Sequence, residues 1–94
     1  MYSEALVKTD HASRYLQQLC KHWSHKLPTK FDKLNGEIEL PMGNCNLNAT
    51  DDTLVISVQA DEEKDVAKLE EVLASHLLRF AFREDLKVVW QRGD

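Results

Sequence analysis

Imidazole and guanidinium groups gather beside the apolar stripe of the first amphipathic segment, which begins at Ala12 and ends before Pro28. At about 100° per residue, Arg14, His22 and His25 fall on or near one flank of that stripe. Two histidines at i and i+3 can share a metal ion, although i, i+4 is the better attested helical spacing and a third ligand is needed. The ordinary interpretation is half-exposed histidines near a helix C-terminus, where positive charge is favoured.

A second basic group lies on one flank of a later amphipathic segment and consists of His76, Arg79 and Arg83. Two like charges one helical turn apart repel each other slightly. Such a pair is tolerated on a solvated surface, or it holds an anion through charge-assisted hydrogen bonds. The commoner outcome is a set of surface salt bridges with the acids nearby in sequence, which are Glu70, Glu71, Glu84 and Asp85. His76 sits at the edge of the apolar stripe, where a hydrogen-bonded core histidine is more common than a catalytic one.

If the two segments are neighbouring helices, their facing flanks form a shallow groove. Cationic and imidazole groups in a groove suit a carboxylate, a phosphate or a catecholate. Helical periodicity does not say which flanks face each other, so this remains a hypothesis. The candidate ligand-binding residues are Arg14, His22, His25, His76, Arg79 and Arg83.

Alternating apolar and polar residues predict the strands that must carry these helices. We expect strands at 3–8, 29–34, 37–40, 45–49, 54–60 and 86–90, and helices from Ala12 and after Asp61 to about 82–85. Thr9 or Asp10 is expected to cap the first helix, and Asp61 the second. Asn35-Gly36 predicts a two-residue type I′ hairpin turn, which places Phe31 opposite Leu40 and Lys33 opposite Ile38.

This order, β-α-β-β-β-β-α-β, predicts a single α+β domain over residues 1–94. Hairpins imply a mainly antiparallel sheet. The outward strand positions are mostly polar, so both helices should cover one face in a two-layer sandwich. Cys20 and Cys45 fall on core faces, which suits buried reduced thiols.

Composition removes several classes of function. A net charge of −4 argues against a duplex nucleic-acid binder. There is no apolar run of about 18 residues for a membrane span, and residues 1–10 do not resemble a signal peptide, so we expect a cytoplasmic protein. Neither a nucleophile elbow nor a phosphate-binding glycine loop is present, so no cofactor is expected and the balance leans away from an enzyme.

Two stretches carry a family resemblance: ASRYLQQLCKHWSHK at 12–26 and SHLLRFAFREDL at 75–86, with a closing Val-Val-Trp at 88–90. With these motifs the whole chain resembles the bacterial domain of unknown function family 2218. The resemblance implies a small bacterial module that also occurs joined to siderophore-interacting flavin reductases, which points toward iron uptake. The family pattern, carried over by position, marks Ser13, Arg14, Tyr15, His22, Trp23, His25, Lys26, His76, Arg79, Phe80, Phe82, Arg83 and Glu84.

Three hypotheses follow. The first is a non-catalytic binding or accessory module for an anionic small molecule or an iron chelate, linked to siderophore metabolism. The second is a small metal-dependent or acid–base enzyme that uses His22, His25 and His76. The third is an interaction module that forms a homodimer or binds a siderophore-interacting reductase through a sheet edge or the helix layer.

Overall fold

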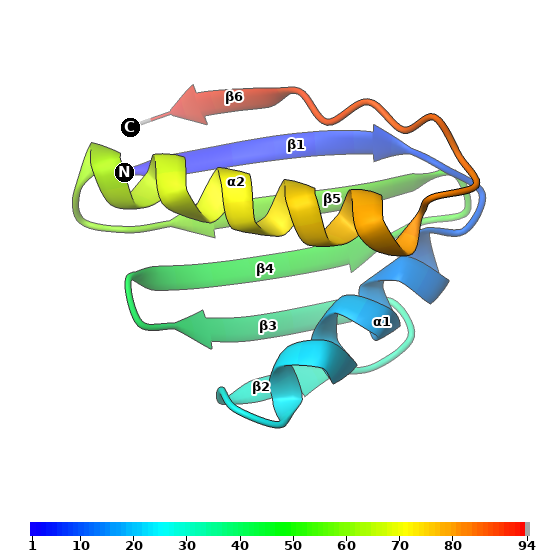
Figure 1. The fold of residues 1–94 in the computed structure, drawn as a ribbon, viewed down its shortest axis with the longest axis horizontal. Coiled ribbons are helices and arrows are strands. Elements are labelled where there is room, and N and C mark those ends of the chain that lie inside the picture. The colour runs from blue at the N-terminus through cyan, green and yellow to red at the C-terminus, as the bar shows by residue number, and fades with distance from the viewer. Residues whose placement is uncertain (94) are drawn as a thin grey trace.

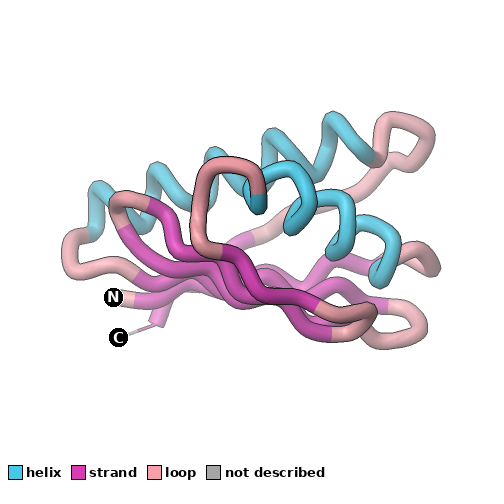
Figure 2. The backbone as a smooth tube through the Cα atoms, turned by 90° about the horizontal axis from the view of Figure 1, so that it is seen from below, coloured by secondary structure: helices cyan, strands magenta, loops and turns pink. Residues whose placement is uncertain are grey.

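The computed structural model describes residues 1–93 and contains one antiparallel sheet covered by two helices. The six strands lie in the order β2-β3-β4-β5-β1-β6. Both helices cover the same face of the sheet, which confirms the predicted two-layer α+β architecture (Figure 2). The elements are β1 (Tyr2–Lys8), α1 (Ala12–Ser24), β2 (Thr29–Phe31), β3 (Asn35–Leu40), β4 (Gly43–Ala49), β5 (Thr53–Gln59), α2 (Glu63–Phe80) and β6 (Trp90–Gly93).

The core lies between the sheet and the two helices. Alternate residues of β1, β4 and β5 are buried, and the intervening positions face outward. Helix α1 packs mainly on β2 and β3, whereas α2 packs on β4, β5 and β1 (Figure 1). Within residues 1–93, neither helix is long and apolar enough to cross a membrane. This arrangement sets α1 and α2 side by side, with one flank of each available to the other.

The hairpin between β2 and β3 has a different register from the one predicted. Phe31 pairs with Gly36 instead of Leu40, and Ile38 pairs with Thr29 instead of Lys33. The predicted type I′ turn at Asn35-Gly36 is wrong, because both residues belong to β3 and no described residue has a positive φ.

Asp32 closes the hairpin in place of a glycine turn. Its Oδ1 accepts hydrogen bonds from the backbone N–H groups of Leu34 and Asn35, both at 2.8 Å. An aspartate that bonds to the backbone two residues later organises a turn without left-handed backbone angles. Gly36 is buried against α1, where an added Cβ would lie 2.7 Å from Cys20 Sγ. The glycine therefore permits a close approach between sheet and helix.

Element ends also differ from the prediction. Helix α1 ends at Ser24, and its first turn follows His11 instead of Thr9 or Asp10, although Thr9 Oγ1 accepts the His11 backbone N–H at 3.1 Å. Helix α2 is preceded by Glu62, which makes no side-chain cap, so Asp61 is not the capping residue.

The last strand starts later than predicted, at Trp90 instead of Leu86. Leu86 and Val88 still pack against the core, so their alternation was interpreted correctly. Pairing with β1 begins only at Trp90, opposite Ala5.

Both cysteines are free and fully buried, as predicted. Burial raises the pKa of the Cys20 thiol to about 11, and burial together with the neighbouring Cys20 raises the pKa of Cys45 as well. Because the thiolate is the reactive form, Cys20 is expected to react with a disulfide reagent only as fast as the protein opens. Absorbance of the released thiol measures this rate, and both cysteines should label at once in denaturant. Prompt labelling of Cys20 in the folded protein would reject its place in the core.

Candidate functional site

The basic flanks of the two helices meet in the structure. The rings of His22 on α1 and His76 on α2 have centroids 5.0 Å apart. The Trp23 ring lies 4.7 Å from His76, and the Phe80 ring lies 5.9 Å from His22. These four side chains, His22, Trp23, His76 and Phe80, form a continuous imidazole–aromatic cluster that joins the helices.

The two histidines of this cluster are held differently. His76 Nδ1 lies 2.7 Å from the backbone carbonyl of Val72, which can only accept, so Nδ1 donates this hydrogen bond. Burial lowers the pKa of His22, and the nearby His76, Arg79, Lys26 and His25 lower it further. His22 is therefore mainly a neutral imidazole at pH 7 and offers hydrogen bonds more than charge.

A second part of the interface opens into a cavity of about 520 Å³, which we call the helix groove. Helix α1 supplies one wall. The end of α2 and the turn that follows it supply the other. The lining residues are His11, Arg14, Tyr15, Gln18, Phe80, Phe82, Arg83 and Glu84. Phe80 lies at the junction, because it lines the groove and also belongs to the imidazole–aromatic cluster through its contact with His22.

Glu84 is the one carboxylate of the helix groove, and it is bound on two sides. It accepts hydrogen bonds from the Tyr15 hydroxyl and from Thr9 Oγ1, the latter at 3.0 and 3.2 Å. The Tyr15 hydrogen bond lowers the pKa of Glu84, with help from Thr9 and from the charges of His11 and Arg14. Burial and Glu84 in turn raise the pKa of Tyr15 to about 12. At neutral pH the pair is thus a fixed carboxylate with a protonated phenol.

The arginines of the helix groove have no such partner. Within residues 1–93 the ion pairs are Lys64 with Glu62, and Arg92 with Glu63 and Glu70. Arg14, Arg79 and Arg83 take part in none of them, so the predicted surface salt bridges of Arg79 and Arg83 are absent from this part of the chain. The Arg83 guanidinium instead lies over the Phe82 ring, 5.4 Å from its centroid. Its planar N–H donors remain available to a ligand.

The structure brings together four of the six predicted site residues in two pairs, His22 with His76 and Arg14 with Arg83. Arg79 is exposed and close enough to affect His22 electrostatically. His25 is the C-cap of α1, is exposed, and does not line the helix groove.

Helical geometry missed four residues of the groove wall: Tyr15, Phe80, Phe82 and Glu84. Tyr15 and Phe80 continue the apolar stripes of the two helices, so periodicity alone indicates core residues, and both do pack in or against the core. Phe82 and Glu84 follow the last residue of α2, where helical periodicity gives no direction. The family pattern did mark all four, so the missing signal was present in the motifs.

The described residues do not favour a metal site. Among residues 1–93, no three His, Cys, Asp or Glu side chains gather in a group that could hold a metal ion. The metal-dependent or acid–base enzyme that uses His22, His25 and His76 stays a prediction.

A hollow of similar size, about 530 Å³, lies on the opposite face of the sheet. Its side chains are a mixture of amides, charges and small groups from β2 to β5, including Lys30, Glu37, Asn46 and Ser57. Part of its hydrogen-bonding capacity is already used, because the Asn48 amide donates to Asn35 Oδ1 at 2.9 Å. The helix groove brings two arginines, one carboxylate and three aromatic rings together, so it is the stronger candidate for a functional site.

A known protein family matches most of the chain. The model of a family described as uncharacterized protein conserved in bacteria, DUF2218, matches residues 4–91. The chain belongs to the DUF2218 family. This confirms the resemblance seen in the two helical motifs. A search of curated proteins found no match.

A solved structure is similar to this DUF2218 protein along nearly its full length. The NMR structure of PA4090 from Pseudomonas aeruginosa has 34% sequence identity and a TM-score of 0.84. The match covers 99% of this chain and 97% of PA4090. The DUF2218 match spans both helices and every residue of the helix groove, so the candidate site lies inside the family domain.

Proposed function

We propose that this DUF2218 protein is a non-catalytic binding module that holds an anionic small molecule in the helix groove. One observation carries the proposal: Arg14 on α1 and Arg83 after α2 line the same cavity, and neither forms an ion pair within residues 1–93. A guanidinium fork matches a carboxylate or phosphate with two parallel hydrogen bonds. Two such groups facing one cavity favour an anion there.

The protonation states in the helix groove support binding over acid–base catalysis. A general acid or base works best with a pKa near the working pH. Tyr15 has its pKa raised to about 12 and Glu84 has its pKa lowered, so both keep one form at neutral pH. The arginines stay charged throughout. Arg14, Arg83, Tyr15 and Glu84 therefore keep a constant pattern of charge.

Iron chelates fall within this proposal, because many carry carboxylate or catecholate oxygens that an arginine pair can bind. The resemblance to modules joined to siderophore-interacting reductases supports this member of the class, a reductase as partner, and a cytoplasmic location. Arg14 and Arg83 support an anion site whichever of these narrower assignments holds.

Removal of Arg83 is expected to weaken anion binding about tenfold or more, because a charge-assisted hydrogen bond contributes about 1.5–3 kcal/mol. Arg14→Ala should act similarly. The measurement is the thermal shift of the purified protein with acetate, benzoate, citrate and inorganic phosphate, followed by calorimetric titration. Lys21→Ala is the control, because Lys21 is exposed on α1 and lies outside the groove lining.

The unfolding free energy of Arg83→Ala should stay within about 1 kcal/mol of the parent, since the arginine is exposed and forms no ion pair with residues 1–93. Arg79→Ala should be equally stable and lose less affinity, because Arg79 does not line the helix groove. Destabilisation of Arg83→Ala, with no affinity of the parent for any of the four anions, would overturn the proposal.

A further inference from the structure

The helix groove combines its charges with exposed aromatic surface, most of it at Phe82. Phe82 is 75% exposed, more than any other large hydrophobic residue of the described chain. A single exposed apolar residue needs no explanation by itself. Phe82, however, lies at the rim of a cavity that Phe80 and Tyr15 also line, and Arg83 packs on its ring. Exposed aromatic area is thus placed beside the anion-binding groups.

The charge of the helix groove limits which anion fits. Arg14 and Arg83 supply two positive charges, and Glu84 supplies one negative charge. These three side chains together carry one net positive charge. Hydrogen bonds from Tyr15 and Thr9 hold the Glu84 carboxylate at the groove wall. A ligand with two or more negative charges therefore meets a fixed carboxylate, whereas a monoanion is matched.

We propose that the preferred ligand class of the helix groove is an aromatic monocarboxylate. Its carboxylate is bound by Arg14 and Arg83, and its ring packs on Phe82 and Phe80 at the rim. Aromatic rings pack in offset or edge-to-face arrangements, and a cation over a ring face adds to the attraction. This inference rests on the proposed function, because it names the ligand class of the same site.

The volume of the groove agrees with this class. Small-molecule sites have volumes of about 300–1,000 Å³ and combine apolar walls with a few convergent polar groups. The helix groove, at about 520 Å³, accepts a ligand with one or two fused rings. Aliphatic acids of equal charge satisfy the arginines but lack the ring contact. Inorganic phosphate and citrate lack the ring contact and carry more charge.

The test compares ligands that differ in one property at a time. Calorimetric titration of the full chain uses 2-naphthoate, benzoate, cyclohexanecarboxylate, citrate and inorganic phosphate. Benzoate is expected to bind about 3- to 10-fold more tightly than cyclohexanecarboxylate, which has the same charge and similar size. 2-Naphthoate should bind more tightly still.

Two variants separate the ring contact from the charge. Phe82→Leu keeps an apolar side chain, so benzoate should fall to the affinity of cyclohexanecarboxylate while the latter changes little. Phe31→Leu is the matched control, because Phe31 is an exposed phenylalanine on β2, outside the groove. Glu84→Gln keeps the shape of the side chain and should raise affinity for phosphate and citrate relative to benzoate.

The outcomes distinguish this inference from the proposal beneath it. Suppose that binding requires the arginines, but benzoate and cyclohexanecarboxylate bind equally and Phe82→Leu changes neither affinity. The aromatic preference is then wrong, and the anion site is retained. Tighter binding of citrate or phosphate than of benzoate overturns the monoanion assignment. Absence of binding for all five ligands overturns both proposals.

Discussion

Gly43→Ala is expected to lower the free energy of unfolding by about 3 kcal/mol, the upper end of the usual cost of overpacking. An added Cβ at Gly43 would lie 2.2 Å from the backbone oxygen of Gln59, and 3.0 Å from both Ala60 Cβ and Leu69 Cδ1. A backbone atom cannot turn aside as a flexible side chain can. The start of β4, the Gln59–Ala60 segment before α2, or both must therefore shift. Urea denaturation measures the loss.

Gly36→Ala is the matched comparison, with an expected loss of about 1 kcal/mol or slightly more. Its added Cβ would meet the Cys20 sulfur at 2.7 Å, but the nearest atoms belong to side chains. Cys20→Ala removes that sulfur, so the double variant should show a favourable coupling between the two sites. A Gly43→Ala protein as stable as the parent, or an additive double variant, would contradict these packing distances.

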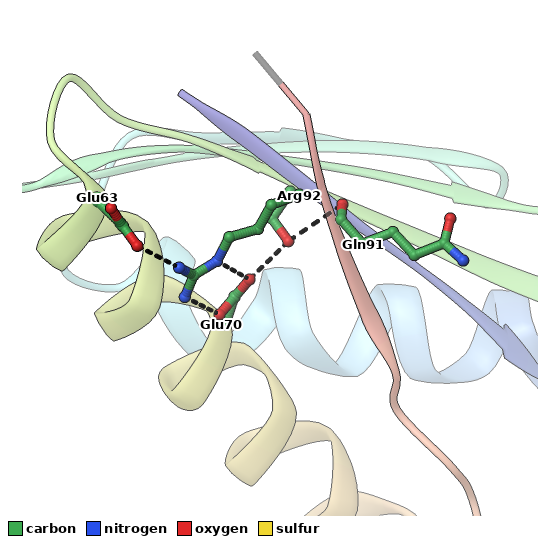
Figure 3. A network of polar contacts seen from close by, with 5 residues as sticks. Glu63, Glu70, Gln91 and Arg92 are labelled. Atoms are coloured by element: carbon green, nitrogen blue, oxygen red, sulfur yellow. Dashed lines mark hydrogen bonds and ion pairs between the residues drawn. The ribbon is translucent and has the colours of Figure 1, made fainter.

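Glu70→Ala is expected to cost about 2 kcal/mol of stability, because it breaks the network that holds the C-terminal strand on α2 (Figure 3). Glu70 Oε2 accepts from Ser3 Oγ at 2.6 Å and from Arg92 Nε at 3.1 Å, and Oε1 accepts from Arg92 Nη2 at 2.9 Å. The Ser3 side chain is fully buried, so the variant leaves its hydroxyl with only a long contact to the Gln91 carbonyl. Glu63→Ala removes the exposed arm of the same network and should cost much less.

The same network makes a pH prediction. The Arg92 hydrogen bond, together with Ser3, lowers the pKa of Glu70 below its ordinary value despite burial. A carboxyl with a lower pKa in the folded protein stabilises the fold above its unfolded pKa, and this contribution is lost as the pH falls through the folded pKa. The difference in stability between the parent and Glu70→Gln should thus be full at pH 7 and shrink below about pH 4. A constant difference down to pH 2 would contradict the ion pair.

The residues around the helix groove show which features of the site helical periodicity predicts. The flank positions of Arg14, His22 and His76 follow from about 3.6 residues per turn. His22 and His76 do meet across the two helices, and Arg14 lines the groove with Arg83. His25 is predicted on the same flank, but it lies at the C-terminal end of α1, whereas the groove opens beside residues 11–18 at the other end of that helix. The Tyr15 ring is buried in the core, yet its hydroxyl reaches Glu84, because tyrosine combines an apolar ring with a polar end.

The hairpin error has a related cause. Asn-Gly is a strong local signal, but here Asp32 already organises the turn through two backbone hydrogen bonds. Gly36 is then used where α1 approaches β3, a contact between residues 16 positions apart that no local pattern displays. Tertiary packing overrode the turn propensity.

The sequence by itself determined the elements, their order and the buried faces, because alternation and helical periodicity are local consequences of which side chains leave water. It also determined the family, through motifs in both helices. Only the tertiary structure decided the strand register, the start of β6, and which basic groups face one another. These depend on how distant segments are placed, such as Arg92 against Glu70 and Arg83 across the groove from α1. The packing of helices on a shared sheet sets that placement.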